Sequence, residues 1–159
     1  MEIRTATPGD FQAMWAIFQG ALASGDTLPF AGTFDAGTFQ SHWFGSQTPH
    51  VAVLVDQVVG MYKMGPNYPD LGAHVASATY VVDARAQGRG VGRALVEHSL
   101  ERARAEGFLA MQFNYVVSTN GPAVALYRKL GFDVVGTLPK AFRHGQLGLI
   151  DVFVMHRFL

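Results

Sequence analysis

Apolar and polar positions follow two different periods along this chain, and these periods predict helices and strands in turn. Between residues 10 and 23 the apolar side chains recur every three or four positions, which predicts an amphipathic helix. Short runs rich in Val, Ile and Tyr, bounded by Gly, Pro and Asp, predict strands. The expected strands cover residues 2–6, 51–55, 58–62, 74–82, 109–116, 132–137 and 150–158, and the expected helices cover residues 10–23, 35–44, 93–106 and 120–130.

The order of these elements predicts a mixed α/β fold. Residues 51–62 should form a hairpin turning around Asp56 and Gln57. The helix at 93–106 crosses between two strands, and strands joined by such a crossover run parallel. A chain of 159 residues, 49% of them hydrophobic, can bury its own core and leaves no room for a second domain. We therefore expect a single domain, residues 1–159, built on a twisted sheet flanked by helices.

The composition excludes several classes of function. Twelve basic residues balance twelve acidic ones, which argues against a nucleic-acid partner held by phosphate neutralisation. Without cysteine there is no disulfide, no Cys-ligated metal and no thiol nucleophile, and we expect no metal. The first residues lack the pattern of a signal peptide, and no apolar run approaches the ~18 residues that cross a bilayer. A cytoplasmic enzyme or ligand-binding domain without a membrane partner is the expectation.

A glycine-rich segment is the first place where the sequence suggests chemistry. It reads Gln87-Gly88-Arg89-Gly90-Val91-Gly92 and lies between an expected strand and an expected helix. Glycine permits a tight turn, and the first N–H groups of a helix form an anion site that the helix dipole favours. Arg85, Arg89 and Arg93 add positive charge. The segment predicts a phosphate or pyrophosphate site, and the alternative is a glycine-rich connection that binds no ligand.

This segment resembles the Q/R-x-x-G-x-G/A loop of the GNAT acetyltransferases. A second stretch, from Asn120 through Tyr127 to Phe132, is similar to the N-x-x-A-x-x-L-Y-x-x-x-G-F motif of the same superfamily. The resemblance covers roughly residues 50–157 and implies a GNAT fold, whose two central strands splay apart. It also implies that acetyl-CoA is the co-substrate and that the backbone amides of residues 88–93 hold its pyrophosphate.

The resemblance assigns roles to individual residues. Val82 matches the position whose backbone N–H faces the acetyl carbonyl, a donor of the oxyanion-hole type. Tyr127 matches the tyrosine that faces the CoA sulfur, where a protonated phenol can donate to the departing thiolate; packing is its alternative role. Asn120 matches an asparagine that contacts the pantetheine arm, and it can equally cap its helix. No general base is nominated, and His74 and His144 are the first histidines to consider.

A narrower resemblance bears on the acceptor. It points to a GNAT subfamily that includes fungal enzymes acetylating azetidine-2-carboxylate, a proline analogue, and it implies that Asn67 and Asn114 bind a small amino acid. A turn at Asn67 and a structural hydrogen bond at Asn114 are the alternatives. The match is carried by four short segments, Gly65–Pro69, Gly72–Val75, Gln112–Asn114 and Ser118–Asn120.

Together these features predict an acetyl-CoA-dependent N-acetyltransferase that acts on the amine of a small molecule. Amino and imino acids are the favoured class of acceptor. The alternatives are a protein or peptide N-acetyltransferase and a non-catalytic acyl-CoA sensor. We also expect a homodimer. The candidate walls of the acceptor pocket are Trp15, Phe30, Phe34 and Trp43, and the alternative for each is a place in the core or in a dimer interface. An exposed cluster of Phe142, Phe153 and Phe158 would be a candidate interface.

Overall fold

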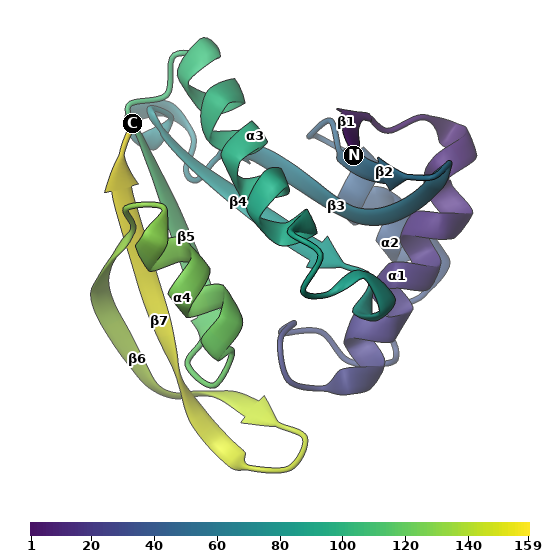
Figure 1. The fold of residues 1–159 in the computed structure, drawn as a ribbon. Helices are drawn as coiled ribbons and strands as arrows, with labels where there is room; N and C mark the ends of the chain where they lie inside the picture. The colour runs from purple at the N-terminus through teal and green to yellow at the C-terminus, as the bar shows by residue number, and fades with distance from the viewer. The chain divides into compact units, whose positions relative to one another are not determined.

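A computed structural model describes all residues from 1 to 159 (Figure 1). Its strands follow the order β1-β2-β3-β4-β5-β7-β6. The β4–β5 pair is parallel, whereas the β1–β2, β2–β3, β5–β7 and β6–β7 pairs are antiparallel, so the predicted mixed sheet is confirmed. No helix has both the length and the apolarity to cross a membrane. The elements are β1 (Glu2–Thr5), α1 (Phe11–Ser24), α2 (Ala36–Phe44), β2 (His50–Leu54), β3 (Gln57–Pro66), β4 (Val75–Val82), α3 (Val91–Ala105), β5 (Ala110–Val117), α4 (Gly121–Lys129), β6 (Asp133–His144) and β7 (Gly148–Phe158).

The chain forms two compact units, each with its own core. The first, unit 1, comprises residues Met1–Ala23, Phe30–Gly65 and Ala78–Ser99. The second, unit 2, comprises Ser24–Pro29, Pro66–Ser77 and Leu100–Leu159.

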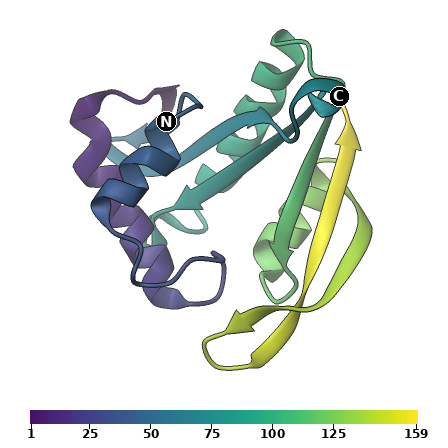
Figure 2. The ribbon, with the colours of Figure 1, turned by 180° about the vertical axis from the view of Figure 1, so that it is seen from behind.

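In unit 1, helices cover both faces of the strands. The first half of α3 lies on one face of β2 and β3, and α1 and α2 lie on the opposite face (Figures 1 and 2). Val91 and Leu95 of α3 belong to a buried apolar cluster with residues of β2 and β3. Gly60 of β3 allows this close approach, because a Cβ there would lie 2.9 Å from the side chain of Val91 and 3.3 Å from the carbonyl oxygen of Val81.

In unit 2, α4 lies on one face of β5, β7 and β6 (Figure 1). The sequence pattern places Tyr115 on the same face of β5 as buried Met111 and Phe113. That prediction is wrong, because the register against β7 shifts between Phe113 and Val116. After the shift Tyr115 is 37% exposed, whereas Val116 is only 6% exposed. An irregularity in strand pairing therefore ends the alternation on which the prediction depended.

Other elements differ from the expected bounds at their ends. Helix α3 begins at Val91, two residues before the expected start, and β6 continues to His144 instead of ending at residue 137. The hairpin turn lies at Val55 and Asp56, whereas it was expected at Asp56 and Gln57. The φ angles of Val55 and Asp56 are 47° and 60°, and positive φ at both central residues is a feature of a favoured two-residue hairpin turn.

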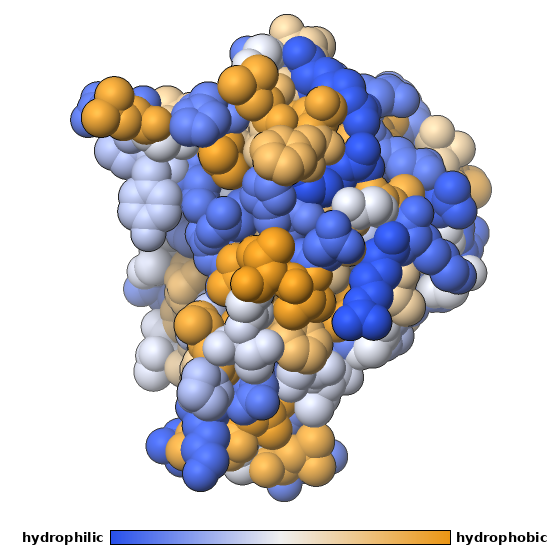
Figure 3. All heavy atoms as spheres, turned by 90° about the vertical axis from the view of Figure 1, so that its left-hand side faces the viewer, coloured by the Kyte–Doolittle hydropathy of each residue, from blue (hydrophilic) through white to orange (hydrophobic).

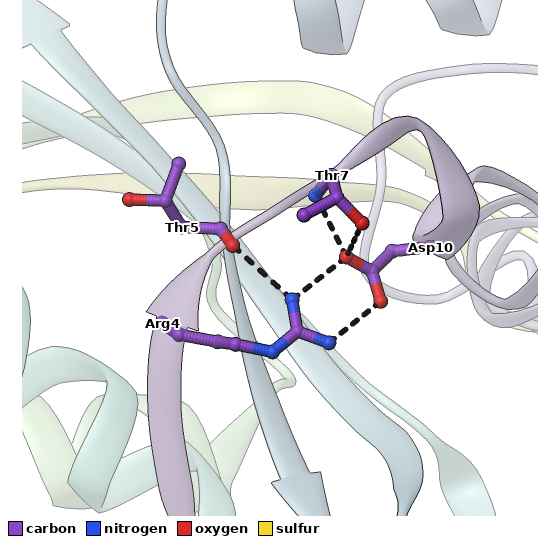
Figure 4. A network of polar contacts seen from close by, with 4 residues as sticks. All are labelled: Arg4, Thr5, Thr7 and Asp10. Carbon is purple, nitrogen blue, oxygen red and sulfur yellow. Dashed lines mark hydrogen bonds and ion pairs between the residues drawn. The ribbon is translucent and has the colours of Figure 1, made fainter.

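A charged network ties β1 to the start of α1 (Figure 4). The guanidinium of Arg4 donates to both carboxylate oxygens of Asp10 at 2.8 and 2.9 Å. The backbone N–H and the hydroxyl of Thr7 donate to the same carboxylate at 2.7 and 2.9 Å. The hydrogen bonds from Arg4 hold the pKa of Asp10 well below its usual range, although burial opposes this shift.

We expect Asp10→Ala to lower the free energy of unfolding by about 2 kcal/mol at neutral pH, because Arg4 and Thr7 lose their shared acceptor. The depressed pKa means that this stabilisation is present above the unfolded-state pKa of aspartate, near 4, and declines as the pH falls below it. Urea unfolding of both proteins should therefore show a smaller difference near pH 3 than near pH 7. A difference independent of pH would contradict this account.

Candidate functional site

The glycine loop has the backbone conformation that its sequence suggests. Gly88 and Gly90 have φ angles of +74° and +79°, in the left-handed region that glycine adopts without strain. Nothing lies within 4 Å of a Cβ built at either position, so it is the backbone conformation, and no crowding, that favours glycine. Gln87 to Gly90 are exposed, directly before α3.

The start of α3 provides N–H groups for an anion. The N–H of Ala94 donates to the carbonyl oxygen of Gly90 at 3.0 Å, which closes the first turn. The N–H groups of Val91, Gly92 and Arg93 have no preceding helical carbonyl to bond, and the positive end of the helix dipole lies at the same place. An exposed glycine loop leading into such a helix fits a pyrophosphate group.

The charge around this loop is smaller than the sequence suggests. Arg85 pairs with Asp83 at 2.6 Å, and Arg93 pairs with Glu97 at 2.8 Å. Of the three arginines that sequence analysis placed here, Arg89 is the one without a carboxylate partner. Two of the three positive charges are therefore partly neutralised, and the backbone N–H groups are the main feature that favours an anion.

Val82 is the last residue of β4. The N–H of the next residue, Asp83, donates to the carbonyl oxygen of Val59 on β3 at 2.9 Å. Because successive N–H groups of an extended chain point to opposite edges, the N–H of Val82 points away from β3. That orientation is compatible with the donor role that the family resemblance implies for it.

Tyr127 lies on α4 with its ring packed against other aromatic rings. Its ring centre is 4.6 Å from that of Phe113 and 6.0 Å from that of Phe132. Burial raises the pKa of Tyr127 to about 12. The phenol therefore keeps its proton throughout the neutral range, as a proton donor must. Packing and proton donation, which sequence analysis treated as alternatives, are compatible in this geometry.

Both ends of α4 are capped. The side-chain oxygen of Asn120 accepts from the N–H of Ala123 at 3.4 Å, which confirms the predicted N-cap. At the other end the guanidinium of Arg157 donates to the carbonyl oxygen of Leu130 and lies 5.9 Å from the centre of the Phe132 ring. No local pattern in the sequence singles out Arg157, because it reaches Leu130 from a strand 27 positions further along the chain.

The two asparagines proposed for the acceptor are hydrogen-bonded to each other. Asn114 Nδ2 donates to Asn67 Oδ1 at 2.6 Å, and Asn67 Nδ2 donates to Asn114 Oδ1 at 3.3 Å. Gln112 Nε2 also donates to Asn114 Oδ1, at 2.9 Å. An amide has two N–H donors and two acceptor lone pairs. One N–H on each asparagine and one lone pair on Asn67 Oδ1 therefore remain for a ligand.

Two histidines, considered as bases, and the aromatic residues of the expected interface are the remaining candidates. His144 Nδ1 accepts from the N–H groups of Gln146 and Leu147 at 3.0 and 3.1 Å, so it stabilises the β6–β7 turn. His74 is exposed, and its role as a base stays a prediction. Phe142 is only 5% exposed, which contradicts its expected place in an exposed aromatic cluster, whereas Phe158 is 79% exposed.

Comparison with known proteins decides the family. The model of the Acetyltransferase (GNAT) family matches residues 14–132. The chain belongs to the GNAT family. A solved GCN5-related N-acetyltransferase from Kribbella flavida is 42% identical, with a TM-score of 0.96 over 99% of this chain and 97% of that one. The GNAT fold predicted from the two motifs is thus confirmed.

Two curated relatives in this family are named for amino acid substrates. An L-methionine sulfoximine/L-methionine sulfone acetyltransferase of Pseudomonas aeruginosa is 29% identical, over 87% of this chain and 83% of the relative. An L-amino acid N-acetyltransferase of Escherichia coli is 32% identical, over 67% of this chain and 65% of the relative. The chain spans only 13% and 47% of the lengths of two other curated relatives that it matches.

Proposed function

We propose that this GNAT protein is an acetyl-CoA-dependent N-acetyltransferase that acts on the amine of a small amino or imino acid. The glycine loop that opens α3 is the observation that carries the use of acetyl-CoA. The relatives named for L-amino acids and L-methionine sulfoximine support the acceptor class. The narrower resemblance to the fungal azetidine-2-carboxylate enzymes adds imino acids to this proposal.

In the proposed reaction a C–N bond forms between the acceptor amine and the acetyl carbon, and the C–S bond of the thioester breaks. The backbone N–H groups of residues 88–93 bind the pyrophosphate, and the Asn120 amide contacts the pantetheine arm. The N–H of Val82 donates to the thioester oxygen as negative charge develops there. The Tyr127 hydroxyl donates its proton to the departing sulfur. The ammonium form of the amine must lose one proton to solvent before it attacks, so kcat should rise toward alkaline pH. The second proton, which the nitrogen loses as the amide forms, returns through water to the Tyr127 oxygen.

We expect Asn67→Ala and Asn114→Ala each to lower kcat/KM for the acceptor by roughly 5- to 150-fold, because each variant removes hydrogen-bonding groups that would pair with the substrate. Binding of acetyl-CoA should change little. Steady-state kinetics with a panel of amino and imino acids measures the first effect, and calorimetry with CoA measures the second. Gln146→Ala, in the exposed β6–β7 turn, is the matched control. If both variants acetylate the preferred amine normally, or if that amine has no carboxylate, the acceptor proposal is wrong.

Two alternative functions give different results in the same assays. A protein or peptide acetyltransferase would give a higher kcat/KM with peptides than with any free amino acid. An acyl-CoA sensor would bind CoA tightly and acetylate no amine in the panel. The predicted proton donor, Tyr127, favours an enzyme over a sensor.

We also propose that the protein is a cytoplasmic, single-domain homodimer. Strand β6 is last in the strand order, so one of its edges has no partner within the chain. Figure 3 shows apolar side chains among polar ones on the side of the molecule that carries β6. Light scattering at micromolar concentration should give the mass of a dimer, and a monomer mass would contradict this. The exposed apolar residues of β6 and of the segment that follows it are Val135, Leu138, Leu147 and Leu149.

A further inference from the structure

Lys63, on β3, holds an ammonium group that no carboxylate neutralises. Among the lysine and arginine side chains, only those of Arg4, Lys63 and Arg157 are partly buried. Arg4 pairs with Asp10, and Arg157 donates to two backbone carbonyl oxygens. Lys63 Nζ donates to one backbone carbonyl oxygen, and no carboxylate lies within ion-pair distance of it. Lys63 is therefore a partly buried cation whose charge the protein leaves uncompensated.

One aromatic ring lies beside this ammonium group, and two more lie beside the histidine whose carbonyl oxygen it binds. Lys63 Nζ lies 5.7 Å from the centre of the Trp43 ring and donates to the carbonyl oxygen of His42. The His42 ring is 5.2 Å from that of Phe30 and 5.7 Å from that of Phe34. All four aromatic residues expected as walls of an acceptor pocket lie in unit 1. Of these, Trp43 is the one beside the cation, and its side chain is fully buried.

The titratable neighbour of Lys63 does not neutralise it. Burial lowers the pKa of His42, and the charge of Lys63 lowers it further. The imidazole is therefore neutral above the ordinary pKa of histidine. Neither its neutral nor its protonated form carries a negative charge that would neutralise Lys63. Burial also lowers the pKa of Lys63 to about 8. The His42 carbonyl oxygen lies in the last turn of α2, where the helix dipole favours a cation, which offsets part of the cost. An ammonium has three N–H donors, and the protein engages one of them.

A buried charge is costly unless it is paired, and charge-assisted hydrogen bonds to carboxylates are among the strongest in proteins. A ligand carboxylate would supply both the opposite charge and the missing acceptors. The partly exposed rings of Phe30 and Phe34 would pack against the apolar part of the same ligand, and they would exclude water that otherwise weakens the ion pair. Phosphate is a less suitable ligand here, because one ammonium would neutralise only part of its charge.

We infer that Lys63 is a specificity-determining residue that binds the carboxylate of the acceptor, in a subsite bordered by the partly exposed Phe30 and Phe34. This inference rests on the proposed function, because it names the part of the acceptor that Lys63 recognises. It explains why a protein without excess positive charge retains an unpaired lysine beside an aromatic ring. It also predicts that an amino acid and its carboxamide differ as acceptors because of this one side chain.

The test compares acids with their carboxamides. Wild type, Lys63→Met and Lys63→Arg are assayed with L-methionine and L-methioninamide, and with L-proline and L-prolinamide. We expect Lys63→Met to lower kcat/KM for the acids by roughly 10- to 100-fold and for the amides by less than about 3-fold. Lys63→Arg, which keeps the charge, should retain most of the preference for the acids. Lys129→Met, an exposed lysine of α4, is the matched control.

An equal loss for acids and amides in Lys63→Met would overturn the inference, because Lys63 would then only stabilise the end of α2. Unchanged kinetics would overturn it as well. If Lys63→Met does not fold, Lys63→Gln and Lys63→Arg still give the ratio of acid to amide activity. If wild type acetylates neither acid but does acetylate peptides, the proposed function itself fails, and this outcome is distinct from a loss of the acid preference in the variants.

Discussion

Gly90→Asp should raise the KM for acetyl-CoA by about 100-fold or more while the protein stays folded, which corresponds to about 2.7 kcal/mol of lost binding. The substitution places a carboxylate in the loop where the phosphates approach, and like charges repel strongly at short range. It also puts a side chain on a residue with a φ angle of +79°. Steady-state kinetics with acetyl-CoA as the varied substrate measures the effect, and circular dichroism checks the fold.

Gly107→Asp separates the effect of the charge near the phosphates from backbone strain. Gly107 follows α3, has a φ angle of +85° and would have nothing within 4 Å of an added Cβ, so the same substitution introduces comparable strain and the same charge. Its KM for acetyl-CoA should stay within about 3-fold of wild type, since a distant exposed charge is largely screened. Normal acetyl-CoA binding by a folded Gly90→Asp protein would remove the loop from the site.

Tyr127→Phe should lower kcat by about 100-fold and change acetyl-CoA binding far less. General acid catalysis contributes roughly 10²- to 10⁴-fold, and thiolate is a good leaving group, so the lower end applies. The Phe113 and Phe132 rings would still pack against the new side chain, which keeps the helix in place. Single-turnover measurements ensure that the rate compared between the two proteins is the rate of the chemical step. Tyr80→Phe, which removes a hydroxyl bonded to Ser99 at 2.6 Å, is the matched control.

A Tyr127→Phe variant with the wild-type rate in a step limited by chemistry would reduce Tyr127 to a packing role. The pH profile gives a second check. Because burial raises the pKa of Tyr127 to about 12, its proton is not lost as the pH rises from neutral to moderately alkaline values. At saturating acceptor, the wild-type kcat should therefore rise with the fraction of neutral amine, without a decline caused by this phenol.

Local signals in the sequence were sufficient for much of the fold. Asn120 was predicted as a helix cap, and its side chain does accept from the N–H of Ala123. Asp35 was expected to begin a helix, and its side chain accepts from the N–H of Thr38. Such caps depend on residues within one turn of each other, so they can be found in the sequence. The pairing of Arg93 with Glu97 follows the same i,i+4 rule, and this spacing could have shown that the charge of Arg93 is partly neutralised.

Contacts between distant positions could not be found in this way. The shift in register that exposes Tyr115 depends on how β5 meets β7, and no local pattern encodes it. The Asn67–Asn114 pair spans 47 positions, and only the family resemblance singled out both residues. Lys63 has no sequence signature at all, because its unusual property is the absence of a carboxylate around it, which only the packed structure can reveal.

The most direct test of the account is an acceptor screen that follows both products of the reaction. The purified protein is incubated with acetyl-CoA and a panel of amino acids, imino acids, simple amines and peptides, while released CoA thiol and acetylated product are measured together. The account predicts equal amounts of thiol and of an N-acetylated small amino or imino acid, with a higher kcat/KM than for any peptide. Tight CoA binding without turnover of any amine, or a clear preference for peptides, would contradict it.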